Sequence, residues 1–381
     1  MSRSIVTCVE DLRGLAQRRV PRLFYDYVDS GSWSEETYRR NSHDLASLKF
    51  RQRVGCDVGD IRTDTTLLQA RVAMPVGLAP AGLAGMVHPD GEIHAARAAA
   101  RFGVPYVLST VSICSIEELA ARTSTPFWFQ LYVMRDREFV ERLIERANAA
   151  GCPALVLTMD LPVQGQRHKD IRNGLSVPPR VTLRTLMAMA LHPRWCLGMA
   201  QTPRRTFGNI VGHAKGVSDT LGFSEWVGRQ FDRTVTWDDV RWIRAQWRGK
   251  LVVKGVMDAR DALHARDAGA DAVVVSNHGG RQLDGAPSSI SALPAIVRAV
   301  DSTMEVHFDG GVRSGQDVLR ALALGADSAW IGRAYMYGLG AQGEAGVSRC
   351  LDILHNELMS TMALCGLTRV TDASPDLLIN P

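Results

Sequence analysis

Short apolar segments rich in β-branched residues recur along the chain, and each ends in or leads into Gly, Pro, Ser, Thr or Asp. They span residues 74–80, 106–110, 127–132, 154–160, 251–255, 271–277, 305–311 and 328–333. Most are separated by amphipathic segments, such as DGEIHAARAAARFG and SGQDVLRALALGA, whose apolar spacing predicts helices. Near-continuous apolar strands that alternate with helices are typical of a parallel sheet buried on both faces. The pattern predicts an α/β fold, a (β/α)8 TIM barrel, with an open doubly wound sheet as the alternative.

One interval breaks this rhythm, because residues 161–250 separate the fourth and fifth predicted strands. Within it, residues 171–218 contain no Asp or Glu but several basic residues around the apolar stretch TLRTLMAMALHPRWCLGM. Such a composition fits a segment that binds a membrane surface, and it equally fits an active-site lid or a subunit contact. Residues 1–70, before the first strand, are predicted to form an N-terminal helical cap within a single domain spanning 1–381.

Composition narrows the classes of protein. The chain has 381 residues, 46% of them hydrophobic, which is enough for one barrel-sized domain. Its 44 basic and 40 acidic residues leave a net charge of +4 without a long basic run, so no nucleic-acid partner is expected. The seven cysteines are scattered without a CxxC pair, so we expect no metal site and no disulfide framework. No signal peptide and no run of 18 apolar residues are apparent, and the expectation is a reduced, intracellular compartment.

Chemically capable side chains follow the predicted strands, where a (β/α)8 barrel carries its active site. The last two strand ends, FDGGVRSG and IGR, place Gly310, Gly311, Arg313 and Arg333 where such barrels bind phosphate. The middle ends carry Ser, Thr and Gln, which offer donors and acceptors to a flat heterocycle, and Lys254 adds a fixed charge beside it. Phosphate and heterocycle together predict a mononucleotide cofactor.

The stretch VVVSNHGGRQLDG, residues 273–285, leaves a buried strand and at once presents an imidazole and a guanidinium. His278 is the natural general base, because its ordinary pKa lies close to physiological pH. Asp160, two strands away, is expected to orient the ring, and Arg281 and Arg167 are suited to bind a carboxylate through paired hydrogen bonds. The GLGAQG stretch at 338–343 opens no βαβ unit and is therefore not interpreted as a dinucleotide fingerprint.

Several motifs together resemble the FMN-dependent α-hydroxy-acid dehydrogenase/oxidase family over about residues 8–375. They are SNHGGRQLDG, FQLY, VKG, DGGVRSG, IGRAYMYGL and YDYVDSG. Within that family, FRQRV, LAPAGLAGM and LSTVSICSIEEL are similar to the bacterial respiratory members that oxidise L-lactate. LHPRW and SPDLLINP are similar to the mandelate-oxidising members.

The resemblance implies an FMN cofactor and oxidation of an L-2-hydroxy acid, in the first place L-lactate to pyruvate. (S)-mandelate or another aryl 2-hydroxy acid is the alternative substrate. A quinone or a cytochrome is the implied electron acceptor, and the implied form is a homo-oligomer, a tetramer, peripherally associated with the cytoplasmic side of the inner membrane. An oxidase that uses oxygen is a further alternative, less favoured because Pro80-Ala81-Gly82 replaces the Pro-Thr-Ala typical of oxidase members.

The resemblance also implies a role for each site residue. His278 is the base, Asp160 is its partner, and the substrate is held by Tyr27, Tyr132, Arg167 and Arg281. The implied FMN contacts are Pro80, Ala81, Ser109, Gln130, Thr158, Lys254, Ser276, Asp309, Gly310, Gly311, Arg313, Gly332 and Arg333. An FMN-barrel isomerase, a non-redox phosphate-sugar enzyme and a silent binding protein remain as other classes, and a flavin spectrum bleached by substrate would separate them from a dehydrogenase.

Overall fold

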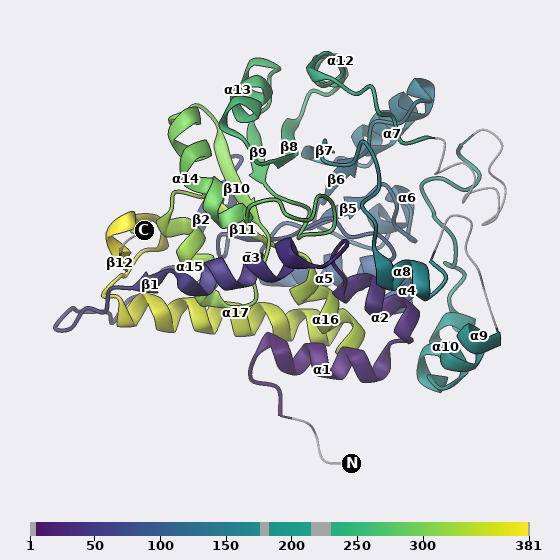
Figure 1. Ribbon diagram of the computed structural model, residues 1–381, viewed down its shortest axis with the longest axis horizontal. Coiled ribbons are helices and arrows are strands. Elements are labelled where there is room, and N and C mark those ends of the chain that lie inside the picture. Colours follow the sequence, from purple (N-terminus) through teal and green to yellow (C-terminus); the bar gives the residue numbers. More distant parts are fainter. Residues whose placement is uncertain (1–4, 176–182, 215–229, 380–381) are drawn as a thin grey trace.

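The computed structural model describes residues 5–175, 183–214 and 230–379, and its centre is a barrel of parallel strands with helices around it (Figure 1). The barrel strands are β4 (Val76–Leu78), β5 (Val107–Ser109), β6 (Trp128–Leu131), β7 (Ala154–Thr158), β8 (Lys250–Val256), β9 (Ala272–Val275), β10 (Glu305–Asp309) and β11 (Ser328–Ile331). Seven of the eight predicted apolar segments contain one of these strands, and the eighth, 251–255, lies within the longer β8. The predicted (β/α)8 TIM barrel is therefore confirmed.

The sheet closes on itself. Its order is β4-β11-β10-β9-β8-β7-β6-β5, and a parallel bridge between Leu78 and Tyr106 joins the two end strands. The open doubly wound alternative is thereby excluded. Small aliphatic side chains fill the interior together with Trp128 and Trp330, whose rings lie 5.0 Å apart. Because the interior is packed, space for a ligand remains at the carboxyl ends of the strands.

Helices surround the barrel as the amphipathic segments predicted. They are α4 (Ala84–Val87), α5 (Gly91–Phe102), α6 (Ile116–Ala120), α7 (Arg137–Ala149), α12 (Trp237–Gln246), α13 (Ala259–Asp267), α14 (Ser289–Val300), α15 (Gly315–Ala323), α16 (Arg333–Gln342) and α17 (Glu344–Leu364). Helix α15 shows how the sequence sets such an element. Ser314 and Asp317 form a reciprocal capping box at its start, and Val318 and Leu322 are buried on its inner face. The GLGAQG stretch lies in and directly after buried α16 and forms no phosphate loop.

The N-terminal region adds three helices, α1 (Val9–Arg19), α2 (Arg22–Asp29) and α3 (Glu36–Ser47) (Figure 1). Helices α1 and α2 pack against α16, and α3 packs against α14 and α15. Strand β1 (Lys49–Phe50) pairs with β12 (Leu378–Ile379), after the short helices η1 (Val370–Asp372) and η2 (Pro375–Leu377). A hairpin of β2 (Thr65–Leu67) and β3 (Ala70–Val72) precedes the barrel. Helix α2 brings Tyr27 to the end of the barrel where the strands finish.

The long interval after β7 holds α8 (His168–Arg172), α9 (Leu183–Ala190) and α10 (Pro193–Gln201), and residues 176–182 and 215–218 of the predicted insertion lie outside the described residues. Trp195 holds α10 against α2 and α4, because its ring packs on Phe24 and its Nε1 donates to the Met86 carbonyl at 2.8 Å. Arg204, one of the basic residues of this segment, is buried and paired with Asp90 at 3.0 Å. It therefore adds nothing to a basic surface.

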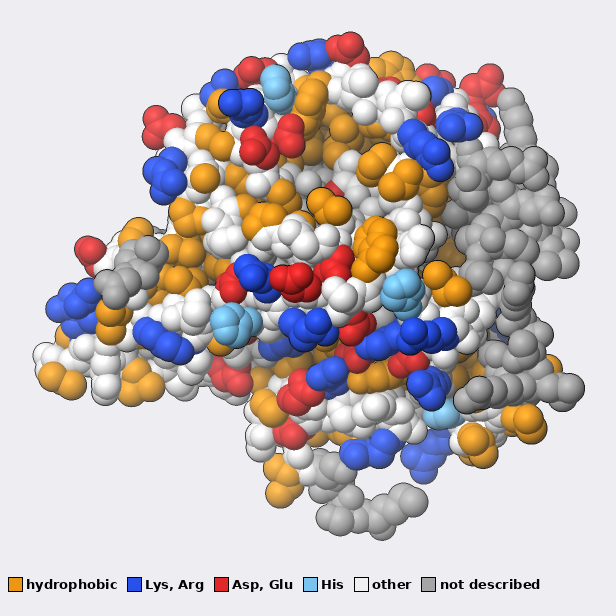
Figure 2. Space-filling view, in the orientation of Figure 1, with side chains coloured by type: hydrophobic (Ala, Val, Ile, Leu, Met, Phe, Trp, Pro, Cys, Tyr) orange, Lys and Arg blue, Asp and Glu red, His pale blue; other side chains and the backbone are white. Residues whose placement is uncertain are grey.

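The other face of this segment is apolar and exposed. Leu186, Met187, Leu191 and Leu197 are exposed, and in Figure 2 apolar side chains appear at the lower right, where Figure 1 places α9 and α10. None of the helices in the described ranges is long and apolar enough to cross a bilayer.

Candidate active site

A cavity of about 470 Å³ opens at the carboxyl ends of the barrel strands. Sixteen of the residues expected at the site line it: Tyr27, Pro80, Ala81, Ser109, Tyr132, Thr158, Arg167, Lys254, His278, Arg281, Asp309, Gly310, Gly311, Arg313, Gly332 and Arg333. The other three, Gln130, Asp160 and Ser276, lie behind this lining and contact residues within it. The structure thus brings residues that are far apart in the sequence, from Tyr27 to Arg333, together around one cavity.

His278 lies on a strained turn directly after β9. Its φ is +57°, and Gly279 and Gly280 follow at +66° and +70°. A left-handed conformation is uncommon for a residue with a side chain and costs about 1–3 kcal/mol. A hydrogen bond stabilises the turn, because the His278 backbone N–H donates to the Ser276 hydroxyl at 3.1 Å. Such stored strain indicates that the position of the ring matters.

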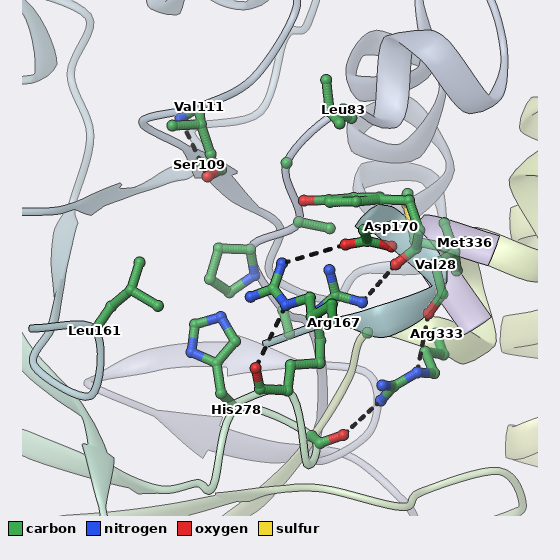
Figure 3. Close-up of a pocket in the computed structure, with 18 of the residues that line it drawn as sticks. Val28, Leu83, Ser109, Val111, Leu161, Arg167, Asp170, His278, Arg333 and Met336 are labelled. Atoms are coloured by element: carbon green, nitrogen blue, oxygen red, sulfur yellow. Dashed lines mark hydrogen bonds and ion pairs between the residues drawn. The ribbon is translucent and has the colours of Figure 1, made fainter. Parts of the chain in front are cut away.

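Asp160 holds the His278 ring, with its Oδ1 2.8 Å from Nδ1 (Figure 3 shows the ring). A carboxylate only accepts hydrogen bonds, so Nδ1 carries the proton and Nε2 of the neutral ring keeps a lone pair. Space for Asp160 comes from a bulge in β8, where the register shifts between Lys254 and Val256. Gly255 at this bulge has a φ of +100°, and a Cβ atom there would lie 2.6 Å from the Cβ of Asp160. The VKG sequence therefore both bends the strand and makes room for the partner of the histidine.

The environment favours a neutral histidine. Burial lowers the pKa of His278 below its usual value, although Asp160 acts in the opposite direction. Burial alone would raise the pKa of Asp160, but the charge and hydrogen bond of His278, together with Lys254, keep it below its ordinary range. The pair is thus a carboxylate that orients a neutral imidazole, which is the arrangement a general base requires.

Two arginines face the same space. Arg167 is buried, and burial together with the nearby charge of Arg281 lowers its pKa to about 10. Arg167 Nε donates to the Arg281 carbonyl at 3.4 Å, and the Arg281 guanidinium lies 4.7 Å from the centre of the Tyr27 ring. Two guanidinium groups held side by side in a buried wall are suited to a carboxylate.

Two tyrosines complete this side of the cavity. Tyr132 stands edge-on to Phe231 at 5.7 Å, and burial raises the pKa of its hydroxyl, so the group stays protonated and able to donate. A methyl group at Gly82 would lie 3.1 Å from the Tyr27 hydroxyl oxygen, which places that hydroxyl above the Pro80-Ala81-Gly82 turn. Both tyrosines line the cavity, so their hydroxyls can donate to a small polar ligand bound there.

The opposite side of the site holds buried polar atoms that no other described residue satisfies. Ser109 Oγ donates to Gln130 Oε1 at 3.0 Å, whereas Gln130 Nε2, Thr158 Oγ1 and Asp309 Oδ1 lack a partner among the described residues. Buried polar groups are rarely left unpaired in folded proteins. Lys254 reaches both the Ser276 hydroxyl at 2.6 Å and Asp309 Oδ2 at 2.7 Å. These donors and acceptors fit the polar edge of a flavin.

The strand ends after β10 and β11 bring the residues expected to bind an anion to the cavity wall. Gly310, Gly311 and Gly332 line the cavity, and a Cβ atom at Gly332 would meet nothing within 4 Å. Arg313 donates to its neighbouring carbonyl of Val312 at 2.8 Å. Arg333 is more engaged than the sequence suggested, because its guanidinium donates to three backbone carbonyls, those of Val28, Gly279 and Ser30.

Sequence reasoning missed part of the wall. Asp170, Leu161, Met189, Phe207 and Phe231 also line the cavity. A usable signal existed for Asp170, because it is the last acidic residue before the acid-free segment and follows Arg167 by three positions, one helical turn. The apolar residues gave no such signal, since their sequence positions do not reveal which long-range neighbours they meet.

Comparison with known proteins identifies the class of this molecule. A family model described as FMN-dependent dehydrogenase matches residues 16–380, and the chain belongs to that family. FMN is therefore its cofactor.

Individual relatives agree with this family. The chain is 50% identical over 379 residues to a protein named L-lactate dehydrogenase from Caulobacter vibrioides, with 98% of each chain covered. It is 45% identical over 377 residues to a protein of the same name from Xanthobacter autotrophicus, covering 98% of this chain and 97% of the relative. A solved structure of the monotopic membrane protein (S)-mandelate dehydrogenase is similar with a TM-score of 0.94 and 37% identity, covering 99% of this chain and 100% of that one.

Proposed function

We propose that this dehydrogenase oxidises an L-2-hydroxy acid to the 2-oxo acid, with L-lactate to pyruvate as its main reaction. The observation that carries the proposal is the His278–Asp160 pair, 2.8 Å apart, in one cavity wall with the arginine pair Arg167 and Arg281. A base beside a carboxylate-binding pair suits a substrate whose carboxylate adjoins the reacting carbon. The relatives named L-lactate dehydrogenase, which match along nearly the whole chain, support lactate as the substrate.

On the substrate side, Arg167 and Arg281 hold the carboxylate, and the hydroxyls of Tyr27 and Tyr132 donate to the substrate oxygens. Nε2 of His278 removes a proton from the substrate, and Asp160 stabilises the imidazolium that forms. Bound FMN supplies the two-electron acceptor. The strained turn fixes the His278 ring in position before the substrate binds, so the ring need not reorient during the reaction.

On the cofactor side, Pro80 and Ala81 would hold the flavin ring, and the side chains at the middle strand ends would bind its polar edge. Those side chains are Ser109, Gln130, Thr158, Lys254 and Ser276. Asp309 would hold the ribityl chain, and Gly310, Gly311, Gly332 and Arg313 would hold the phosphate. Three of the five N–H groups of Arg333 donate to backbone carbonyls, so this residue would offer the phosphate its charge and at most two hydrogen bonds.

The charges of the wall support two anionic groups in the cavity. Five cations line it, Arg167, Lys254, Arg281, Arg313 and Arg333, against two carboxylates, Asp170 and Asp309. A phosphate monoester carries about −1.5 to −2 charges at neutral pH, and a hydroxy acid adds one more. FMN phosphate and substrate carboxylate together would neutralise the excess.

(S)-Mandelate is the second candidate substrate, favoured by the apolar side of the cavity. Val111, Leu161, Met189, Phe207 and Phe231 line it and offer a surface on which an aromatic ring can pack. The similarity to a solved (S)-mandelate dehydrogenase supports this alternative.

The proposed acceptor is a quinone or a cytochrome at the cytoplasmic face of the inner membrane, with a homo-tetramer as the working form. The insertion at 171–218 is the proposed membrane contact, supported by the exposed leucines of the α9–α10 segment and by the exposed Arg194 at the start of α10. Its inner side carries Met189 and Phe207, which line the cavity, so the same segment also serves as a wall of the active site.

The decisive experiment is an anaerobic visible spectrum of the purified protein before and after L-lactate, repeated with (S)-mandelate. Rapid bleaching of a flavin spectrum by lactate and slow bleaching by mandelate is the expected result. The reverse preference would make mandelate the substrate. A flavin that neither acid bleaches would overturn the proposed reaction while leaving the family intact.

A further inference from the structure

Asp170 is a buried carboxylate in the cavity wall to which the proposed reaction gives no role. It lies in α8, three residues after Arg167, and only 4% of it is exposed. Figure 3 shows Asp170 facing Arg167 across the pocket lining. Burying a carboxylate is costly unless a cation or hydrogen bonds compensate it, so its position calls for an explanation.

The contacts of Asp170 connect it to the arginines by charge more than by hydrogen bonding. Its Oδ2 lies 4.0 Å from Nη1 of Arg167, beyond hydrogen-bond distance but close enough for a strong charge interaction. Its Oδ1 accepts a hydrogen bond from the Ser30 hydroxyl at 3.3 Å. The Ser30 carbonyl in turn accepts from Arg281 at 3.2 Å and from Arg333 at 2.7 Å.

The wall offers no equivalent acid for the arginine pair. Of the two carboxylates that line the cavity, Asp309 is paired with Lys254 at 2.7 Å. Asp170 is the other, and its charge opposes the mutual repulsion of Arg167 and Arg281. Asp26 is also near, but it does not line the cavity and bonds instead to Asn173 at 2.7 Å and to Arg22.

We propose that Asp170 is a positioning residue that acts as the resident counter-ion of the arginine pair and limits how tightly that pair binds a carboxylate. The inference rests on the proposed function, in which Arg167 and Arg281 bind the carboxylates of both substrate and product. Two uncompensated buried cations would hold either anion strongly. The negative charge of Asp170 partly neutralises the two arginines, so they bind an anion less tightly. The 2-oxo acid can therefore dissociate after it is formed.

The test is Asp170→Asn, which keeps the shape of the side chain and an oxygen acceptor for Ser30 but removes the charge. The KM for L-lactate and the dissociation constant of oxalate, a non-reacting anion titrated by its effect on the flavin spectrum, should both fall roughly fivefold to tenfold. The kcat should fall as well, because product is released more slowly. Asp26→Asn is the matched control: it removes a charge from the same neighbourhood but outside the cavity, and both constants should stay within about twofold of wild type.

A second variant separates charge from shape. Asp170→Glu retains the charge and should keep the oxalate constant near that of wild type. An unchanged or raised oxalate constant in Asp170→Asn, or equal behaviour of the Asn and Glu variants, would overturn the proposal and leave Asp170 a structural residue. If Asp170→Asn loses its flavin, Ser30→Ala tests the same idea, because it removes the hydrogen bond alone; a tenfold change in oxalate affinity there would contradict a charge effect. Oxalate titration needs no turnover, so its outcome stays distinct from a failure of lactate to bleach the flavin.

Discussion

The rim of the barrel and the α9–α10 segment differ in which side chains they bury. The rim buries ionisable groups, whereas the segment exposes apolar ones. At the rim, ionisable groups are buried and paired, as the neutral His278 is with Asp160 and Lys254 is with Asp309. On α9–α10, leucines that could have been buried are exposed, Leu191 at 80% and Leu197 at 62%. Both arrangements cost free energy in an isolated chain, which indicates that each is completed by something outside it. The lining of the rim fits small anions and a flavin, and for the exposed leucines of the segment we propose contact with an apolar surface.

This comparison predicts a clean separation of effects. Changes at the rim should alter chemistry without altering where the protein is found, and changes on α9–α10 should do the reverse.

The largest effect is expected from His278→Ala. Removing the base should slow anaerobic flavin reduction by L-lactate by roughly 10³–10⁴-fold, near the upper limit for general-base catalysis. Flavin content should stay normal, since the side chain faces the substrate side of the cavity. Stopped-flow absorbance measures the rate, and a variant that bleaches at the wild-type rate would remove His278 from the mechanism.

Asp160→Asn should have the next largest effect. An amide can donate to Nδ1 and so favour the wrong ring tautomer, in which Nε2 carries the proton. Flavin reduction should slow by about 10²-fold or more at neutral pH. A rate within threefold of wild type, with flavin bound and the protein folded, would mean that Asp160 does not orient the ring.

The pH dependence sharpens the same point. The base must be neutral, so kcat/KM should fall as the pH drops through the pKa of His278, and burial places that pKa below its ordinary value of about 6.5. Asp160 raises this pKa, so its replacement by Asn should move the inflection to still lower pH. An inflection above pH 7 in the wild-type enzyme would contradict the buried, neutral histidine.

The rim was predictable from the sequence because its signals are local. Strand ends are marked by the change from valines to Ser, His and Gly, and a parallel barrel brings such ends together whatever their distance along the chain. The bulge at Gly255 and the engagement of Arg333 by three carbonyls were not predictable, because both depend on which backbone atoms meet in three dimensions.

The role of the insertion at 171–218 was harder to predict from its sequence. Its composition fitted a membrane segment, a lid and a subunit contact equally. In the structure, different residues of the segment lie in different surroundings. Met189 and Phe207 line the cavity, and Arg204 is buried in an ion pair. Leu191 and Leu197 are exposed. A composition averages over these faces, which is why the pattern alone could not divide the roles.

The smallest expected effect concerns these outward residues. Leu191→Ser with Leu197→Ser removes two exposed apolar side chains from the segment, and burial of one leucine is worth about 1.5–3 kcal/mol. Because an interface buries them only partly, binding to vesicles with anionic lipids should weaken roughly tenfold. Co-sedimentation measures the binding, and lactate should bleach the flavin at the wild-type rate.

The matched control uses equally exposed apolar residues at another place on the molecule. Val54 and Leu364 are exposed at 87% and 61%, close to the values for the two leucines, but they lie near the paired β1 and β12. If exposed apolar surface acted without regard to place, Val54→Ser with Leu364→Ser would weaken vesicle binding as much. The contact proposed for α9–α10 requires that this pair leave binding within about twofold of wild type, because a membrane can meet only the face turned toward it. Equal loss in both double variants would assign the binding to general surface apolarity, and no loss in either would leave the exposed leucines to a protein partner.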